Sequence, residues 1–80
     1  MKEETKELTF GEKLVGLSFN PSGDDKVTKA KQLCAELADL LDEDFRTEQS
    51  SELKHAVFLN AIGNILDAQM NVVKVLTFKY

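Results

Sequence analysis

The stretch from about residue 52 to residue 77 constrains the fold most, because its apolar side chains cover more than one face of a helix. A helix that is apolar on most of its circumference must be buried by more than one partner. In a chain of 80 residues, a single neighbouring helix cannot provide that cover. The stretch therefore predicts that copies of the chain associate with one another.

A second stretch, from about residue 24 to residue 44, repeats apolar residues at alternating spacings of three and four, which predicts an amphipathic helix. Its apolar stripe consists of Val27, Ala30, Cys34, Leu37 and Leu41, widened by Leu33 and Leu40. We expect this stripe to be the buried face, so that Leu37→Ala costs about 2–5 kcal/mol. The helix ends in the acidic run 42–44, which the helix dipole disfavours, and its end should fray.

The two stretches are joined by a short polar connector, residues 46–51, in which Ser50 or Ser51 is a candidate cap for the following helix. A connection this short favours antiparallel neighbours. Before them we expect a flexible segment, residues 1–9, and a short helix at about 11–17. The predicted fold is all-α: one domain, residues 10–80, formed by an antiparallel helical hairpin with a short N-terminal helix or arm, which assembles into a helical homo-oligomer.

The composition, 42% hydrophobic and 30% charged, is that of a small folded domain. A formal net charge of -4 argues against a DNA or RNA polymer as partner, because such binding depends on clustered Lys and Arg. The first residues lack the apolar run of a signal peptide, and Asp67 and Lys74 interrupt the last helix. We therefore expect a cytoplasmic protein without a membrane-spanning segment.

The chain offers little for catalysis or metal binding. Cys34 is its single cysteine and His55 its single histidine, and neither has a spaced partner for a zinc site or for a nucleophile and base pair. The place of Cys34 in an apolar stripe favours a small buried hydrophobe over a reactive thiol. We expect a protein that is not an enzyme and that needs no metal or cofactor.

The turn at residues 19–25 is the one segment with binding chemistry. Pro21 ends any preceding helix, and Ser22 or Asp24 can cap the helix that follows. A helix N-terminus beside Gly23 can hold a phosphate, with Lys26 and Lys29 nearby. Two further side chains, Phe19 and Asn20, could stack on a base and bond its edge. The alternative is an ordinary capping turn, since Asp24 and Asp25 repel phosphate.

Two features of the expected hairpin concern its assembly. Several amides lie among apolar neighbours and either fix the register between copies or face water: Asn60, Asn64, Gln69 and Asn71. The charges are segregated as well. Residues 36–52 contain seven carboxylates and one basic residue, Arg46, whereas the opposite end is relatively basic through Lys26, Lys29, Lys31, Lys74 and Lys79.

The order of these segments carries a resemblance. The run Phe19-Asn20-Pro21 before a helix that begins near Asp25, and a hairpin ending in Ala68-Gln69-Met70-Asn71-Val72-Val73-Lys74, resemble the small phage and prophage proteins called anti-CBASS cyclic-nucleotide sponges. Their helical-hairpin domain is shared with a group of anti-Thoeris sponges. The likeness covers roughly residues 10–78 in layout, with Phe19 where Tyr is usual and Asn20 where His is usual.

The resemblance implies a compact homohexamer that sequesters the host's cyclic di- or trinucleotide alarm signals without cleaving them. It implies a ligand site around Phe19, Asn20, Pro21 and Gly23, with Lys26 or Lys29 as the phosphate contact. The alternative is a small helical interaction or assembly module, without a nucleotide ligand, that docks onto a phage or host protein through its apolar second long helix. Replacing Phe19 or Lys26 should matter only to a sponge, whereas a charge at Ile65 or Val72 should disable the docking module.

Overall fold

The protein is described here from a computed structural model, which covers residues 7–21, 23–47 and 51–79. Within these ranges the chain forms three α-helices and no strand: α1 (Phe10–Val15), α2 (Asp25–Thr47) and α3 (Glu52–Leu76). The predicted all-α class is confirmed. Two of the candidate caps, Ser22 and Ser50, and most of the segment expected to be flexible lie outside the described residues.

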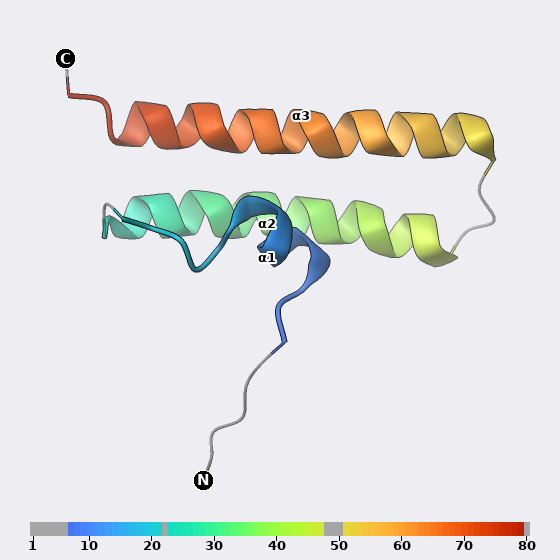
Figure 1. The fold of residues 1–80 in the computed structure, drawn as a ribbon, viewed down its shortest axis with the longest axis horizontal. Helices are drawn as coiled ribbons and strands as arrows, with labels where there is room; N and C mark the ends of the chain where they lie inside the picture. The colour runs from blue at the N-terminus through green and yellow to red at the C-terminus, as the bar shows by residue number, and fades with distance from the viewer. Residues whose placement is uncertain (1–6, 22, 48–50, 80) are drawn as a thin grey trace, which may run out of the picture.

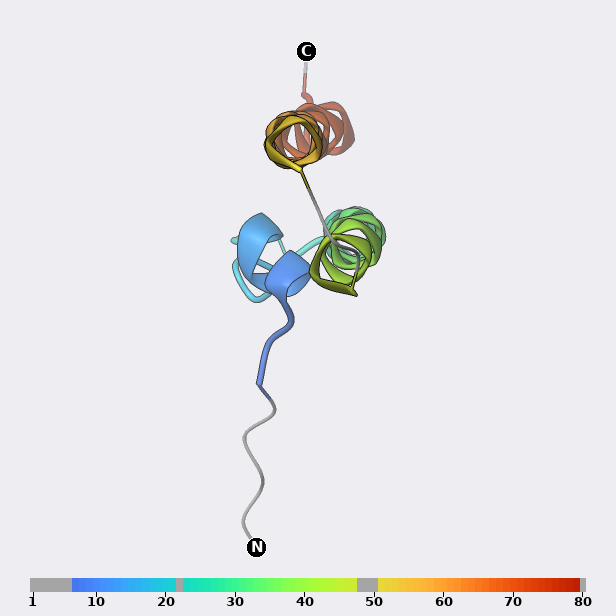
Figure 2. The ribbon, with the colours of Figure 1, turned by 90° about the vertical axis from the view of Figure 1, so that its right-hand side faces the viewer.

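The two long helices lie side by side and run in opposite directions (Figure 1). An end-on view shows α3 on one side of α2 and α1 on another (Figure 2). Ser51 caps α3, because its hydroxyl accepts the Lys54 N–H at 3.1 Å. None of the described helices is long and apolar enough to cross a membrane.

The short helix α1 is held by its caps and by a close approach to α2. Thr9 and Glu12 form a capping box at its start. The helix ends at Val15, two residues before the expected end, and Gly16 follows it in the left-handed conformation. Gly11 lies so close to α2 that a Cβ atom there would be 2.0 Å from the Ala35 carbonyl oxygen. Only glycine allows this contact.

A carboxylate from α2 fixes α1 at the same place. Asp39 accepts the Gly11 N–H at 2.6 Å and the Thr9 hydroxyl at 2.7 Å. Hydrogen bonds to an ionised acceptor are stronger than neutral ones, and these two satisfy donors at the start of α1. The polar contacts and the glycine contact together position α1 across the middle of α2.

The helix α2 continues to Thr47, three residues beyond the expected end at residue 44. The acidic run is compensated by two cations, since Arg46 pairs with Asp42 at 3.1 Å and Lys54 of α3 pairs with Asp44 at 3.1 Å. The Thr47 hydroxyl also donates to the Glu43 carbonyl at 2.9 Å. Partners from outside the run therefore offset its unfavourable interaction with the helix dipole.

The buried core of the described chain is small and consists of Val15, Val27, Ala35, Ala38 and Ile65. The expected buried stripe on α2 holds only in part for the single chain: Val27 is buried, whereas Leu33, Leu37 and Leu40 are 55%, 49% and 61% exposed. The side of α2 that α1 covers is lined by Lys31, Ala35 and Ala38 instead, since the close approach at Gly11 leaves room only for small side chains.

A cluster of aromatic rings joins the helices near the connector. Phe45 of α2 stacks on Phe58 of α3 at 4.5 Å between ring centroids, and it also stacks on His55 of α3 at 5.2 Å. Phe10 of α1 lies 6.4 Å from Phe58. His55 is therefore a packing residue of the helix pair.

Candidate functional site

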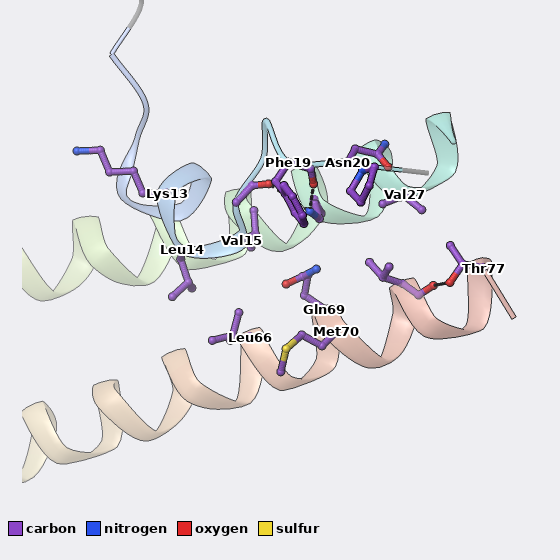
Figure 3. A pocket seen from close by; sticks show the side chains of 14 residues that line it. Lys13, Leu14, Val15, Phe19, Asn20, Val27, Leu66, Gln69, Met70 and Thr77 are labelled. Carbon is purple, nitrogen blue, oxygen red and sulfur yellow. Dashed lines mark hydrogen bonds between the residues drawn. The ribbon is translucent and has the colours of Figure 1, made fainter. Parts of the chain in front are cut away.

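A groove runs between the 16–21 segment and the C-terminal half of α3, and we call it the α1–α3 groove (Figure 3). Its volume is about 660 Å³, within the range typical of small-molecule sites. Side chains of α1, the turn, α2 and α3 form its walls. The lining residues are Lys13, Leu14, Val15, Gly16, Phe19, Asn20, Pro21, Val27, Lys31, Leu66, Gln69, Met70, Val73 and Thr77.

Most of the lining is apolar. Figure 3 shows Leu14 pointing from the α1 side toward Leu66 of α3, with Met70 along the same wall. Phe19 stands at the edge with 69% of its surface exposed. These side chains form a surface against which the flat body of a ligand can pack.

Lys31 supplies the positive charge of the groove and is only 6% exposed. Its ammonium group donates to the Gly16 carbonyl at 3.2 Å and to the Phe19 carbonyl, and lies 5.4 Å from the centre of the Phe19 ring. In the described ranges no carboxylate pairs with it. An ammonium has three donors, so one remains for an acceptor in the groove.

Gln69 lines the same groove from α3. It is 5% exposed, and its side chain points from α3 toward the turn (Figure 3). Within the part of the chain that the structure describes, its carboxamide makes no hydrogen bond. Its nitrogen and oxygen are nevertheless not fully enclosed, because no fully buried side-chain polar atom there lacks a partner. The amide therefore has its remaining access through the groove, where it can both donate and accept.

The structure brings three of the six predicted site residues to this groove: Phe19, Asn20 and Pro21. Asn20 also has a structural task, because its side-chain amide donates to the Asp24 carbonyl at 3.0 Å and to the Thr28 hydroxyl at 2.8 Å. Gly23, Lys26 and Lys29 do not line the groove, and all three are exposed.

The start of α2 already has an anionic partner. The Asp24 carboxylate accepts the Lys26 N–H at 2.8 Å, while the Asp24 carbonyl accepts the N–H groups of Val27 and Thr28 at 3.0 and 3.3 Å. Asp24, one of the candidate caps, therefore accepts an N–H at the helix start as a capping residue does. A phosphate at this helix start would have to displace a carboxylate of the chain itself.

Two groove residues were missed as site residues. Lys31 was counted only as part of a basic helix end, and Gln69 as one of four amides that either fix register or face water. The structure separates these amides, since Gln69 is buried while Asn60, Asn64 and Asn71 are exposed. A usable signal existed in the spacing, because Lys31 shares a helix face with the buried residues Val27, Ala35 and Ala38.

A second, more polar hollow of about 800 Å³ lies on the other side of α1, beside Asp39, Asp42 and Arg46. Asp39 is bonded to α1 and Asp42 to Arg46, so these three charges already have partners within the chain. No three metal-ligating side chains gather anywhere in the described residues. Cys34 is partly buried.

The comparisons with known proteins add no relative: no protein-family model matches this chain, and neither the curated proteins nor the solved structures gave a significant match.

Proposed function

We propose that the protein is a sponge that binds cyclic oligonucleotide second messengers, cyclic di- or trinucleotides, and removes them from bacterial antiviral signalling without cleaving them. The proposal combines the resemblance of the 19–21 turn and the hairpin order with the α1–α3 groove. The observation that carries it is the buried Lys31 ammonium, without a carboxylate partner in the described chain, in a groove that the buried Gln69 also lines.

In this mode of binding, Lys31 gives its third N–H to a phosphate oxygen. A buried ammonium without a counter-ion is costly, and an anionic ligand offsets that cost. Gln69 bonds the polar edge of a base, and the exposed Phe19 ring offers a stacking surface. Lys31, Gln69 and Phe19 thus replace Lys26 and Lys29 as the principal contacts.

The sponge acts by depletion. Tight binding lowers the free concentration of the signal below that which a host effector needs, and the ligand is later released intact. Such a protein is a homo-oligomer in the cytoplasm of the infected cell, with a hexamer as the assembly implied by the resemblance. The numerous exposed apolar side chains of α2 and α3 support the association of copies.

Isothermal titration of the full chain with individual cyclic di- and trinucleotides tests the proposal. We expect at least one of them to bind and to be recovered unchanged. The Gln69→Leu variant, which lacks the amide, should bind that nucleotide at least about tenfold more weakly than the wild type. Gln32→Leu on the exposed surface of α2 is the matched control and should leave the affinity unchanged. The proposal fails if the whole panel shows no binding at high micromolar concentrations.

A second candidate function, a helical interaction or assembly module, is favoured by a different observation. The apolar residues Val57, Leu59, Met70 and Val75 of α3 are more than half exposed. A module of this kind is insensitive to Gln69→Leu and to Phe19→Ala. A charge at Val72, which is 41% exposed, should abolish its function. Titration with the nucleotide panel tests the sponge. Pull-down of partner proteins with the wild type and with the Val72→Glu variant tests the interaction module.

A further inference from the structure

The helix α2 carries an unpartnered seam on the side away from α1. Figure 2 shows α1 on one side of α2 and no described segment on the opposite side. The residues there follow one another at spacings of four, three, four, three and four, the pattern of a coiled-coil seam. They are Lys26, Ala30, Leu33, Leu37, Leu40 and Asp44.

The seam matches itself when one copy is reversed. In an antiparallel pair centred on residue 35, Leu33 faces Leu37 of the other copy and Ala30 faces Leu40. At both ends Lys26 faces Asp44. Each apolar side chain meets an apolar one, and each charge meets its opposite.

The charges beside the seam favour the same orientation. By helical spacing Lys29 and Glu43 lie on the same flank of the seam, and the antiparallel register brings each near the other on the second copy. A parallel pair would instead set Lys26 against Lys26 and Asp44 against Asp44. Complementary charges of this kind decide partner and orientation in coiled coils.

Two carboxylates, Glu36 and Asp44, work against the pairing, but neither prevents it. Glu36 would face its own copy near the two-fold axis, but it is exposed and its charge remains solvated. Asp44 already pairs with Lys54 of its own chain at 3.1 Å, with its side chain 57% exposed. A carboxylate has two oxygens and can accept from both lysines.

We propose that a second copy of this chain covers the seam, with the two α2 helices antiparallel and Lys26 of each copy paired with Asp44 of the other. This deepens the self-association in the proposed function and does not depend on a nucleotide. It assigns Lys26 and Lys29 to the interface between copies, and it explains why three leucines on one face of α2 stay outside the core.

Charge reversal in the full chain tests the register, with self-association measured by sedimentation velocity over a range of protein concentrations and without nucleotide. Lys26→Asp or Asp44→Lys alone turns two attractive contacts into two repulsive ones, because the pair is symmetric, and should weaken association at least about tenfold. The double variant Lys26→Asp, Asp44→Lys restores opposite charges and should return to within about threefold of the wild type.

One disrupting variant and two controls isolate the seam. Lys54→Met removes the pair within one chain and should not reproduce the effect of Asp44→Lys. Leu37→Glu should abolish the pairing while the circular dichroism stays helical, because Leu37 is half exposed in the single chain. Gln32→Glu, on the same helix and also exposed, should leave both the pairing and the helical circular dichroism unchanged.

The outcomes separate this inference from the wider proposal. A chain that is monomeric at every concentration overturns both the seam and the self-association. A chain that assembles, but whose double variant is as weak as the single variants, overturns the antiparallel seam alone. Assembly that tolerates Leu37→Glu does the same, because another occupant must then cover the leucines.

Cross-linking gives an independent reading of orientation. In a Cys34→Ser background, a mixture of Leu33→Cys and Leu37→Cys proteins should oxidise mainly to the mixed disulfide, since these two positions face each other. A parallel pair would yield the two homodisulfides instead, and that result would contradict the proposal.

Discussion

The two sides of α2 carry different kinds of side chain. On the side of α1, the helix presents Ala35 and Ala38, and the contact is made by a glycine, two hydrogen bonds to Asp39 and the ammonium of Lys31. On the opposite side it presents Leu33, Leu37 and Leu40, which remain exposed because no part of the described chain covers them. The contact with α1 uses mainly small and polar groups, whereas the three leucines on the opposite side stay exposed in the described chain.

This difference shows that hydrophobicity alone does not identify the face on which a short chain folds. Close packing of α1 requires small residues, because a larger side chain would hold the helices apart. A leucine stripe with heptad spacing serves equally well between chains. Four substitutions, taken from the largest expected effect to the smallest, test whether the two sides really differ in this way.

The largest effect is expected at the glycine contact. Gly11→Val places atoms where the Ala35 carbonyl lies and should cost about 3 kcal/mol of the free energy of unfolding, as severe overpacking does. Urea denaturation measures it. Gly63 in α3 has no atom within 4 Å of a built Cβ, so Gly63→Ala should stabilise the protein by roughly 0.5–1 kcal/mol. Equal stability of Gly11→Val and wild type would mean that α1 does not dock at Gly11.

Asp39→Ala should have the next largest effect. It removes the acceptor of two donors at the start of α1, and hydrogen bonds to a charged group contribute about 1.5–3 kcal/mol. Hydrogen exchange of the Gly11 amide should accelerate as well. Glu36→Ala changes an exposed carboxylate three residues earlier on the same helix and serves as the control. A similar, small loss in both variants would contradict the anchoring role of Asp39.

Lys31→Met tests the polar contact at the other end of α1. The carbonyls of Gly16 and Phe19 lose their charged donor, while the methionine keeps the apolar part of the side chain. We expect a loss of about 1.5 kcal/mol in unfolding free energy. In dilute solution, where copies do not pair, Lys29→Met replaces an exposed lysine two residues earlier and should stay within about 0.5 kcal/mol of the wild type. Denaturation curves that coincide for the two variants would count against the buried role.

The smallest effect is expected for Leu37→Ala in dilute solution. Leu37 is half exposed, so its truncation should cost about 1 kcal/mol and not the 2–5 kcal/mol of a buried leucine. At concentrations where copies pair, the loss should grow, because association stabilises the folded state. Denaturation at several protein concentrations checks this, and a large loss independent of concentration would place Leu37 in an intramolecular core.

The outline of the fold followed from local signals. Long helical periodicities, the Pro21 turn and the serine at the start of α3 predicted the all-α class and the beginnings of both long helices. The end of α2 was harder to predict, because Asp42, Asp44 and Thr47 are stabilised by partners that no helix rule specifies. Local rules describe a helix end in water, whereas this end lies against α3.

The candidate site was predicted only in part. Phe19, Asn20 and Pro21 lie next to one another in sequence, so their place at one edge of the groove followed from the turn. Lys31 and Gln69 belong to different helices, and their approach depends on how α1 and α3 pack on α2. The exposure of Lys26 and Lys29 depends on the same packing, because the packing decides which side of α2 is buried.

The docking of α1 also has a consequence for the order in which the chain gains structure. A helix of six residues is far too short to persist alone in water. Its anchors, Ala35 and Asp39, lie more than twenty residues further along the chain. During synthesis α1 must therefore wait until the middle of α2 has left the ribosome, and its folding follows that of the helix on which it docks.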